Sequence, residues 1–284
     1  MSLWDKLKSK TKNIDLILSS SGVRAPCFIG ALEALQERDY NIQRVAGSSG
    51  GAIIAAGHAL GMTTAEMRQV APHIPYQKMR DFKIKNLLSL SNPSVYTGRE
   101  LDVFLQDIYG DATLNDFVID CRIAVVTIIG RKRILLDRQS YPELPVWKAV
   151  RMSSTIPFIF PYMDLGGIAV TDGGLVTSMF DIFPDNLRPI ICLRPRADYV
   201  IKKEVQDVKA YRLFLWNYLK IITEYFIDAV DNQHIPQEEW NRTVVIPTYD
   251  IGGFNFYLGP EKINTLIQYG YDAVMTDELG LLTD

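Results

Sequence analysis

Residues 44–56 read Arg-Val-Ala-Gly-Ser-Ser-Gly-Gly-Ala-Ile-Ile-Ala-Ala, so a short β-forming run leads into a turn of glycine and serine and then into a helix-forming stretch. The turn contains the pattern Gly-x-Ser-x-Gly, which between a strand and a helix is typical of a nucleophile elbow. Such an elbow holds its serine in a strained conformation, and small residues at Gly47 and Gly51 let strand and helix pass closely. We therefore expect Ser49 to present its Oγ as a nucleophile. A glycine-rich turn that binds an anion at the helix N-terminus is the alternative.

A second turn of small residues precedes the elbow. The apolar run 14–18 opens into Ser-Ser-Ser-Gly-Val-Arg-Ala at residues 19–25, followed by a helical pattern. Small residues leave backbone N–H groups exposed, and such groups stabilise the oxygen that becomes negative when an ester carbonyl is attacked. A dinucleotide-binding turn is disfavoured, because Ser20 and Ala25 stand where that motif has glycine. The turn is therefore a candidate oxyanion hole.

A carboxylate follows downstream. Residues 166–174 read Gly-Gly-Ile-Ala-Val-Thr-Asp-Gly-Gly, which places Asp172 at the end of an expected strand and directly before Gly173 and Gly174. Functional side chains commonly lie at strand ends, but Asp-Gly-Gly also fits an ordinary turn. Taken alone, this stretch is compatible with either interpretation.

The order of apolar patterns predicts an α/β protein with a mostly parallel central sheet flanked by helices. The length of 284 residues suits one domain over residues 1–284, in which the motifs lie within residues 14–193 and residues 194–284 form a C-terminal extension. Residues 72–97 form a less regular insertion, either a lid or a surface excursion. Strands are expected at residues 14–18, 42–46, 119–129, 134–137, 168–171, 190–193 and 244–246, and helices at residues 28–37, 52–60, 99–108, 145–152 and 205–230.

The charge, the cysteines and the apolar segments of the chain exclude several classes of protein. A formal net charge of -3 and a pI near 5.7 provide no general attraction for nucleic acid. The three cysteines are widely spaced and lie mostly in apolar runs, which is typical of buried free thiols in a reducing compartment. We find no secretory signal and no segment with the length and apolarity of a membrane span, so a soluble, cytoplasmic protein is expected.

The three motifs, in this order, resemble those of the patatin-like phospholipases and the related cytosolic phospholipase A2 catalytic domains. The resemblance covers roughly residues 14–193 and includes Met-Ser-Ser-Thr-Ile-Pro-Phe-Ile-Phe-Pro at residues 152–161, which is similar to a segment that the family carries shortly before its aspartate. It implies a three-layer α/β/α fold, and a catalytic dyad in which Ser49 is the nucleophile and Asp172 the general base. It implies neither a metal nor an organic cofactor.

The resemblance also maps an oxyanion hole onto Ser21, Gly22 and Arg24. The chain departs from the family pattern at Ser20, Ser21 and Ala25, which stand at glycine positions, and it lacks the Asn-x-Pro that often follows the aspartate. If the Arg24 side chain turns inward, it either pairs with a lipid phosphate or locks this loop; a solvated surface arginine is the alternative.

A catalytic triad would need a histidine, and the chain contains only His58, His73 and His234. His58 follows Ser49 by nine residues on the same expected helix, which puts it about 13 Å away on the opposite side. His73 follows Pro72, His234 lies two residues before Pro236, and both fit structural roles. A classical α/β-hydrolase is therefore the second choice of fold.

The expected function is hydrolysis of phospholipid or lysophospholipid esters, with release of a fatty acid. A non-catalytic lipid- or nucleotide-binding regulator on the same scaffold is the alternative. The resemblance is compatible with lipid turnover, with a secreted effector, and with a bacterial antiviral defence phospholipase that a ligand such as a cyclic nucleotide activates.

Two stretches of the sequence concern contacts with a membrane and with another copy of the chain. Residues 1–12 alternate apolar residues with lysines and fit either peripheral contact with the inner face of a membrane or a frayed terminus. Residues 211–230 carry too many apolar side chains for one narrow stripe, which favours core packing combined with a homo-oligomer contact.

Overall fold

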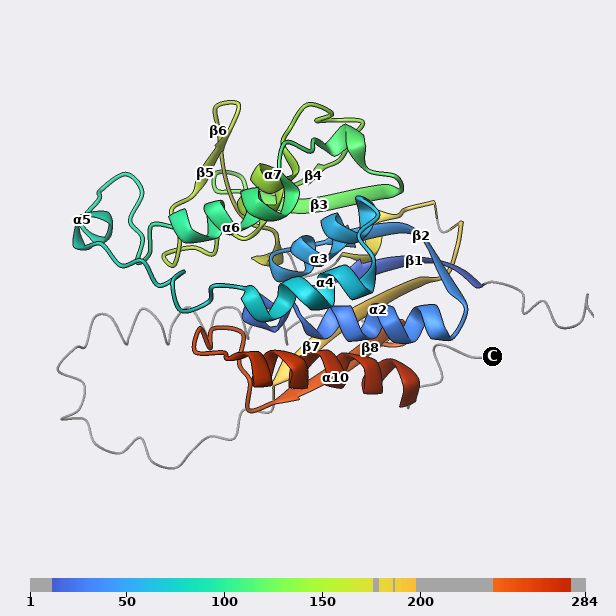
Figure 1. The fold of residues 1–284 in the computed structure, drawn as a ribbon. Helices are drawn as coiled ribbons and strands as arrows, with labels where there is room; N and C mark the ends of the chain where they lie inside the picture. Colours follow the sequence, from blue (N-terminus) through green and yellow to red (C-terminus); the bar gives the residue numbers. More distant parts are fainter. Residues whose placement is uncertain (1–11, 176–178, 186, 198–236, 277–284) are drawn as a thin grey trace, which may run out of the picture.

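A mixed β-sheet of eight strands forms the centre of the protein (Figure 1). The computed structural model describes residues 12–175, 179–185, 187–197 and 237–276. Hydrogen bonding links the strands in the sequence β5-β6-β3-β2-β1-β7-β8, β4 also pairs with β3, and the central pairs are parallel. The strands are β1 (Lys12–Leu18), β2 (Tyr40–Gly47), β3 (Asp120–Thr127), β4 (Arg133–Leu136), β5 (Met163–Leu165), β6 (Ile168–Asp172), β7 (Ile190–Ala197) and β8 (Thr243–Tyr249).

The sheet is flanked by helices, and the predicted fold class is confirmed. Figure 1 shows α2, α4 and α10 lying over one face of the sheet. The α-helices are α2 (Cys27–Glu37), α3 (Gly50–Ala59), α4 (Thr64–Val70), α5 (Ile84–Leu87), α6 (Arg99–Tyr109), α7 (Val146–Ser153), α9 (Gln237–Trp240) and α10 (Pro260–Thr276).

The pairing of β3 decides where the chemistry lies. Along one edge of β3, residues 123–126 pair with β4. Along the other edge, β2 pairs with residues 120–123 and β6 then pairs with residues 125–127, so these two strands follow each other. Gly47 pairs with Ile123 of β3 and Asp172 pairs with Val125. These two β3 residues are two positions apart, which is about 7 Å along the strand. The end of β6 thus reaches the turn that follows β2.

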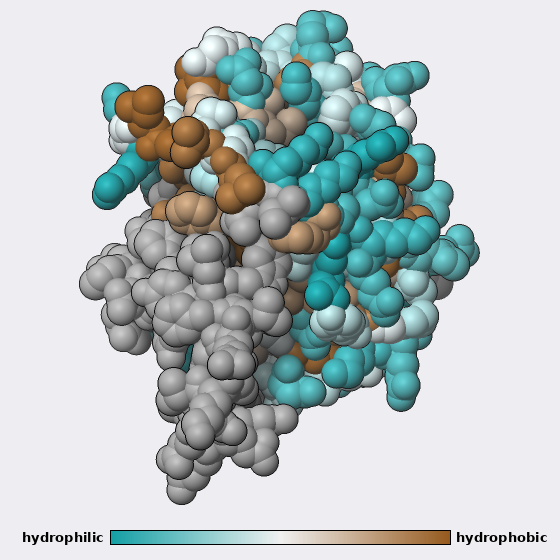
Figure 2. Space-filling model, turned by 90° about the vertical axis from the view of Figure 1, so that its left-hand side faces the viewer, coloured by the Kyte–Doolittle hydropathy of each residue, from teal (hydrophilic) through white to brown (hydrophobic). Residues whose placement is uncertain are grey.

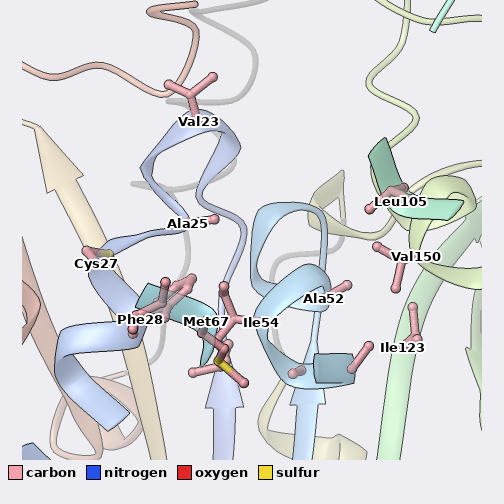
Figure 3. Close-up of a cluster of buried hydrophobic side chains, with 14 of the residues drawn as sticks. Val23, Ala25, Cys27, Phe28, Ala52, Ile54, Met67, Leu105, Ile123 and Val150 are labelled. Atoms are coloured by element: carbon pink, nitrogen blue, oxygen red, sulfur yellow. The ribbon is translucent and has the colours of Figure 1, made fainter. Parts of the chain in front are cut away.

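The main hydrophobic core lies between the sheet and its helices. Phe28 of α2, Ile54 of α3 and Met67 of α4 come together in this cluster (Figure 3). A smaller cluster on the opposite face of the sheet packs Ile182 and Phe183 against the strands. The alternation of strand side chains between the two faces supplies both clusters, because successive residues of a strand point to opposite sides.

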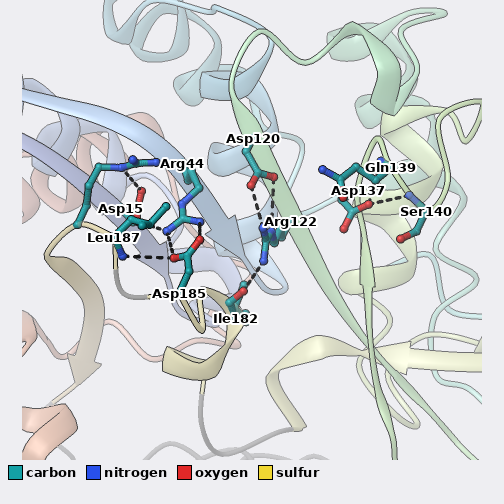
Figure 4. A network of polar contacts seen from close by, with 11 residues as sticks. Asp15, Arg44, Asp120, Arg122, Asp137, Gln139, Ser140, Ile182, Asp185 and Leu187 are labelled. Atoms are coloured by element: carbon teal, nitrogen blue, oxygen red, sulfur yellow. Dashed lines mark hydrogen bonds and ion pairs between the residues drawn. The ribbon is translucent and has the colours of Figure 1, made fainter.

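A buried ion-pair network anchors the segment that carries this smaller cluster (Figure 4). Asp15 is fully buried and accepts hydrogen bonds from Arg44 at 2.5 Å and from Arg188 at 3.0 Å. Arg44 also donates to both carboxylate oxygens of Asp185 at 2.7 Å and lies over the Phe183 ring. Removing one partner would leave a buried charge uncompensated, which typically costs about 3–5 kcal/mol. The network therefore holds Phe183, Asp185 and Arg188 against the sheet.

Seven predicted strands and four predicted helices coincide with described elements. The strand β5 and the helices α4, α5, α9 and α10 were not expected from the sequence. All three cysteines are buried free thiols, as predicted. None of the described helices is both long and apolar enough to cross a membrane. The amphipathic residues 1–11, the predicted helix 205–230 and His234 lie outside the described residues.

The irregular segment 72–97 is held against the body of the protein by backbone and side-chain contacts. Asn92 exchanges two hydrogen bonds with the backbone of Tyr162, at 2.9 and 3.0 Å. Asp81 accepts backbone hydrogen bonds from Gly98 and Arg99 at the start of α6. The segment thus has defined attachments at Asp81 and at Asn92.

Candidate active site

Ser49 occupies the turn between β2 and α3 in a strained backbone conformation. Its φ is +51° and its ψ is -127°, a region that side chains with a Cβ rarely adopt. The Ser49 N–H donates to Ser153 Oγ at 3.0 Å, and Ser153 Oγ donates to the Ala124 carbonyl at 2.6 Å. The end of α7 and strand β3 therefore hold the strained residue in place.

The glycines of the elbow stand where backbones approach closely. A Cβ at Gly47 would lie 2.7 Å from the Cα of Ala52, at the start of α3. A Cβ at Gly51 would lie 2.3 Å from the Leu18 carbonyl oxygen at the end of β1. Both separations are shorter than real Cβ contacts, so α3 can pack this close to β1 and β2 only with glycine at these two positions.

Asp172 is the last residue of β6 and is buried. It pairs with Val125 across the sheet, its N–H donates to the Thr155 carbonyl at 3.0 Å, and its Oδ1 accepts the Gly174 N–H at 2.7 Å. These contacts fix both the backbone and the carboxylate of Asp172. The carboxylate therefore has a defined orientation before any substrate binds.

The two glycines after Asp172 lie against neighbouring groups. A Cβ at Gly173 would lie 2.1 Å from the Ala124 carbonyl oxygen. A Cβ at Gly174 would lie 1.9 Å from Ser20 Oγ, which itself makes a 2.9 Å hydrogen bond to Ser48 Oγ. Ser20, a departure from the family's glycine, is thus accommodated because Gly174 has no side chain.

The predicted oxyanion loop adopts a tight turn beside the elbow. Gly22 has a φ of +55°, and a Cβ there would lie 2.2 Å from the Gly253 carbonyl oxygen, which accepts the Val23 N–H at 2.9 Å. Within the described part of the chain, no backbone or side-chain group accepts a hydrogen bond from the N–H of Ser21 or Gly22. Both amides therefore remain available to a ligand.

Arg24 is buried and takes part in building this loop. Its N–H and its Nε donate to the Ser21 carbonyl at 3.1 and 3.0 Å. The interpretation of Arg24 as a solvated surface residue is therefore wrong. The side chain turns inward and stabilises the loop.

Ser49 and Asp172 line one cleft with about 390 Å³ of empty space. Ser21, Gly22 and Arg24 line the same cleft, so the structure brings the three predicted motifs together. The remaining wall is largely apolar and includes Ile156, Pro157, Leu175 and Phe254. The cleft thus combines a hydroxyl, a carboxylate and backbone amides with surface suited to hydrocarbon.

No histidine within the described part of the chain reaches this cleft. His58 lies near the end of α3, largely buried, and burial lowers the pKa of its imidazole. His73 is exposed. Nor do the described residues contain a group of three or more His, Cys, Asp or Glu side chains arranged to hold a metal ion.

Several supporting residues were not singled out by sequence reasoning. Arg151 is almost completely buried, pairs with Asp102 at 2.6 Å and donates to Thr155 Oγ1 at 2.8 Å. The Thr155 carbonyl accepts hydrogen bonds from Asp172 and from the Thr171 hydroxyl. The family-like segment 152–161 was the available signal for Thr155 and for Ser153. No sequence signal pointed to Gly253, which lies far along the chain.

Comparisons with known proteins point to one family. The family model described as patatin-like phospholipase matches residues 16–184, more than half of the chain. The uncharacterized protein YqhO of Bacillus subtilis is 30% identical over 288 residues, which cover 90% of this chain and 95% of that protein. Lysophospholipase NTE1 of Phaeosphaeria nodorum is 25% identical over 170 residues, 59% of this chain but 11% of that much longer protein.

A solved structure supports the fold independently. VipD from Legionella pneumophila matches with a TM-score of 0.60 over 95% of this chain and 67% of that chain. The sequence identity is 16%, so this likeness concerns the fold alone.

Proposed function

Because this chain belongs to the patatin-like phospholipase family, we propose that it hydrolyses carboxylic ester bonds of phospholipids or lysophospholipids and releases a fatty acid. The observation that carries the proposal is the shared cleft, into which both Ser49 and Asp172 face. Ser49 is the nucleophile and Asp172 the general base. The absence of a histidine from the described wall of the cleft favours a dyad over a triad.

In the first half of the reaction, Ser49 Oγ attacks the acyl carbon of the ester and its proton passes to the Asp172 carboxylate. The strained elbow presents the hydroxyl, and the Gly174 N–H orients the carboxylate. When the tetrahedral intermediate collapses, the alcohol part of the lipid leaves with the proton from Asp172. The fatty acyl group remains on Ser49 as an ester.

In the second half, Asp172 takes a proton from water while the water oxygen attacks the acyl carbon. Collapse of the second intermediate returns the proton to Ser49 Oγ and releases the fatty acid. Both intermediates carry a negative oxygen, and we assign its stabilisation to the N–H groups of Ser21 and Gly22. Removal of one such donor typically costs about 3 kcal/mol of barrier. Arg24 contributes by locking the loop through its hydrogen bonds to the Ser21 carbonyl.

A lipid ester fits the composition of the cleft. The apolar side chains of Ile156, Leu175 and Phe254 suit an acyl chain, while the polar groups gather around the reacting atoms. The name of the relative lysophospholipase NTE1 points to the same substrate class.

Three further proposals concern partners. The pattern of residues 1–12 suggests peripheral contact with the inner face of a membrane, and that of residues 211–230 suggests assembly into a homo-oligomer. The family resemblance allows activation by a small molecule such as a cyclic nucleotide. A role in lipid turnover, as an effector or in antiviral defence would follow from which of these holds. The alternative of a non-catalytic regulator is disfavoured by family membership, and labelling of Ser49 by a fluorophosphonate would exclude it.

The decisive experiment measures fatty-acid release from mixed phospholipid vesicles by wild type, Ser49→Ala and Asp172→Asn. We expect release by wild type and none by either folded variant, with folding checked by circular dichroism. Ser140→Ala and Asp111→Asn, which replace exposed residues of the same types, are the matched controls and should keep full activity. Full activity of Asp172→Asn would overturn the dyad.

A further inference from the structure

Large apolar side chains are exposed on three separate segments of the protein. Leu88 is 71% exposed and Leu90 fully exposed, just after α5 in the irregular segment 72–97. Phe158 is 52% exposed and Tyr257 is 63% exposed. Phe158 also has a φ of +64°, which is unusual for a bulky residue, so its outward position is maintained at the expense of backbone strain.

These segments are fastened to the rim of the catalytic cleft. The N–H of Val95 donates to the Phe158 carbonyl at 2.8 Å, and Phe158 directly follows Pro157, which lines the cleft. On the other side, the Arg80 guanidinium lies over the Tyr257 ring, 4.3 Å from its centroid. Tyr257 follows closely after Phe254, which also lines the cleft. Phe158 and Tyr257 therefore lie beside the cleft, and the segment that carries Leu88 and Leu90 contacts both of them.

The overlapping stretch 75–99, which extends into the start of α6, carries an excess of positive charge. Residues 75–99 contain five basic residues and one acidic residue, a net charge of +4, whereas the whole chain carries -3. The basic side chains are exposed on this segment. They are Lys78, Arg80, Lys83, Lys85 and Arg99.

The shape of this region fits an extended surface better than a small ligand. Figure 1 shows α5 projecting from the body of the molecule, and Figure 2, which views that side, shows apolar side chains gathered in its upper part beside hydrophilic ones. A projection that combines exposed leucines with lysines has the composition of a membrane-binding surface, because the leucines enter the lipid and the lysines pair with anionic headgroups.

We propose that Leu88, Leu90, Phe158 and Tyr257, with the surrounding basic residues of segment 75–99, form a surface that docks the protein on an anionic phospholipid bilayer with the cleft facing the lipid. This inference rests on the proposed function, because docking would deliver lipid esters to Ser49. It concerns described residues and is separate from any contribution of residues 1–11.

Vesicle co-sedimentation of the full chain tests the proposal. The probes are vesicles of phosphatidylcholine alone and of phosphatidylcholine mixed with phosphatidylglycerol. We expect wild type to bind the anionic vesicles, and the double variant Leu88→Ser/Leu90→Ser to bind them at least about tenfold more weakly. The double variant Lys83→Glu/Lys85→Glu should lose a similar factor on anionic vesicles only.

Leu187→Ser is the matched control, since Leu187 is 69% exposed but lies just before the start of β7, whereas the elbow follows the opposite end of the parallel strands. It should bind as wild type does.

Vesicle binding by Ser49→Ala should also be unchanged, so the experiment measures docking even if the proposed chemistry is wrong. Hydrolysis of a soluble short-chain ester by Leu88→Ser/Leu90→Ser should stay within about twofold of wild type. Lack of vesicle binding by wild type, or undiminished binding by the leucine variant, would overturn the proposal.

Discussion

The backbone N–H of Ser49 donates to the hydroxyl of Ser153 at 3.0 Å, so the residue at the centre of the elbow is held by a side chain from α7. Ser153 donates in turn to the Ala124 carbonyl of β3 at 2.6 Å. One hydroxyl therefore connects the turn after β2, the end of α7 and the middle of β3. The strained conformation of Ser49 depends on such contacts, because nothing within the turn itself favours a positive φ.

Replacing Ser153 by alanine should affect both stability and rate. The Ser49 N–H and the Ala124 carbonyl would each lose a buried partner, which typically costs about 1–3 kcal/mol. We expect the free energy of unfolding to fall by that amount and kcat for ester hydrolysis to fall at least about tenfold. Ser154→Ala is the control, since this buried hydroxyl donates only to Val150 within α7. Equal kcat for the two variants would contradict the positioning role of Ser153.

Gly51→Ala should disturb the packing of α3 on the sheet. Its Cβ would lie 2.3 Å from the Leu18 carbonyl oxygen, and neither backbone can move without shifting the elbow. The expected loss is at least about 2 kcal/mol in the free energy of unfolding, measured by urea denaturation. Gly259→Ala is the matched control, because a Cβ there meets nothing within 4 Å. If Gly51→Ala were as stable as this control, the close approach of α3 to β1 would be wrong.

Removal of the histidines should leave hydrolysis intact. The combined variant His58→Gln/His73→Gln/His234→Gln should keep kcat within about threefold of wild type, because neither described histidine lines the cleft. Its pH–rate profile between pH 6 and pH 8 should match that of wild type, as expected when no imidazole serves as the base. A triple variant that folds but lacks activity would show that a histidine takes part in the mechanism.

The Asp185 carboxylate should make the free energy of unfolding depend on pH in the acidic range. Its hydrogen bonds with Arg44 hold the pKa of Asp185 at about 2, below its ordinary value. The unfolded chain therefore binds this proton more readily than the folded protein, so the stabilisation is fully present above about pH 4 and is lost as the pH falls towards 2. In acid titrations of the free energy of unfolding, Asp185→Asn should show a shallower decline over this range than wild type. Parallel curves would refute the assignment.

Local features of the fold could be predicted because they depend on neighbours in sequence. The apolar run 14–18 and the pattern around Ser49 predicted β1, the elbow and α3, and the helix does begin at Gly50. The helix α10 was overlooked, although Ile263, Ile267, Gly270 and Val274 recur with helical spacing. A Cβ at Gly270 would lie 1.7 Å from the Cys27 carbonyl oxygen, so the glycine serves a close approach to α2 that no local pattern reveals.

By itself, the sequence determined which groups are available and which local element presents each one: a serine in a strand-to-helix turn, an aspartate at a strand end, and a loop of small residues. Only the tertiary structure decided that these groups meet. Asp172 reaches the elbow because β6 pairs with the part of β3 that directly follows the residues paired with β2. Gly253, from a distant part of the chain, shapes the loop around Gly22. Strand pairing and packing between distant segments arise from hydrogen bonds and burial that form only when the whole sheet assembles, so no local pattern encodes them.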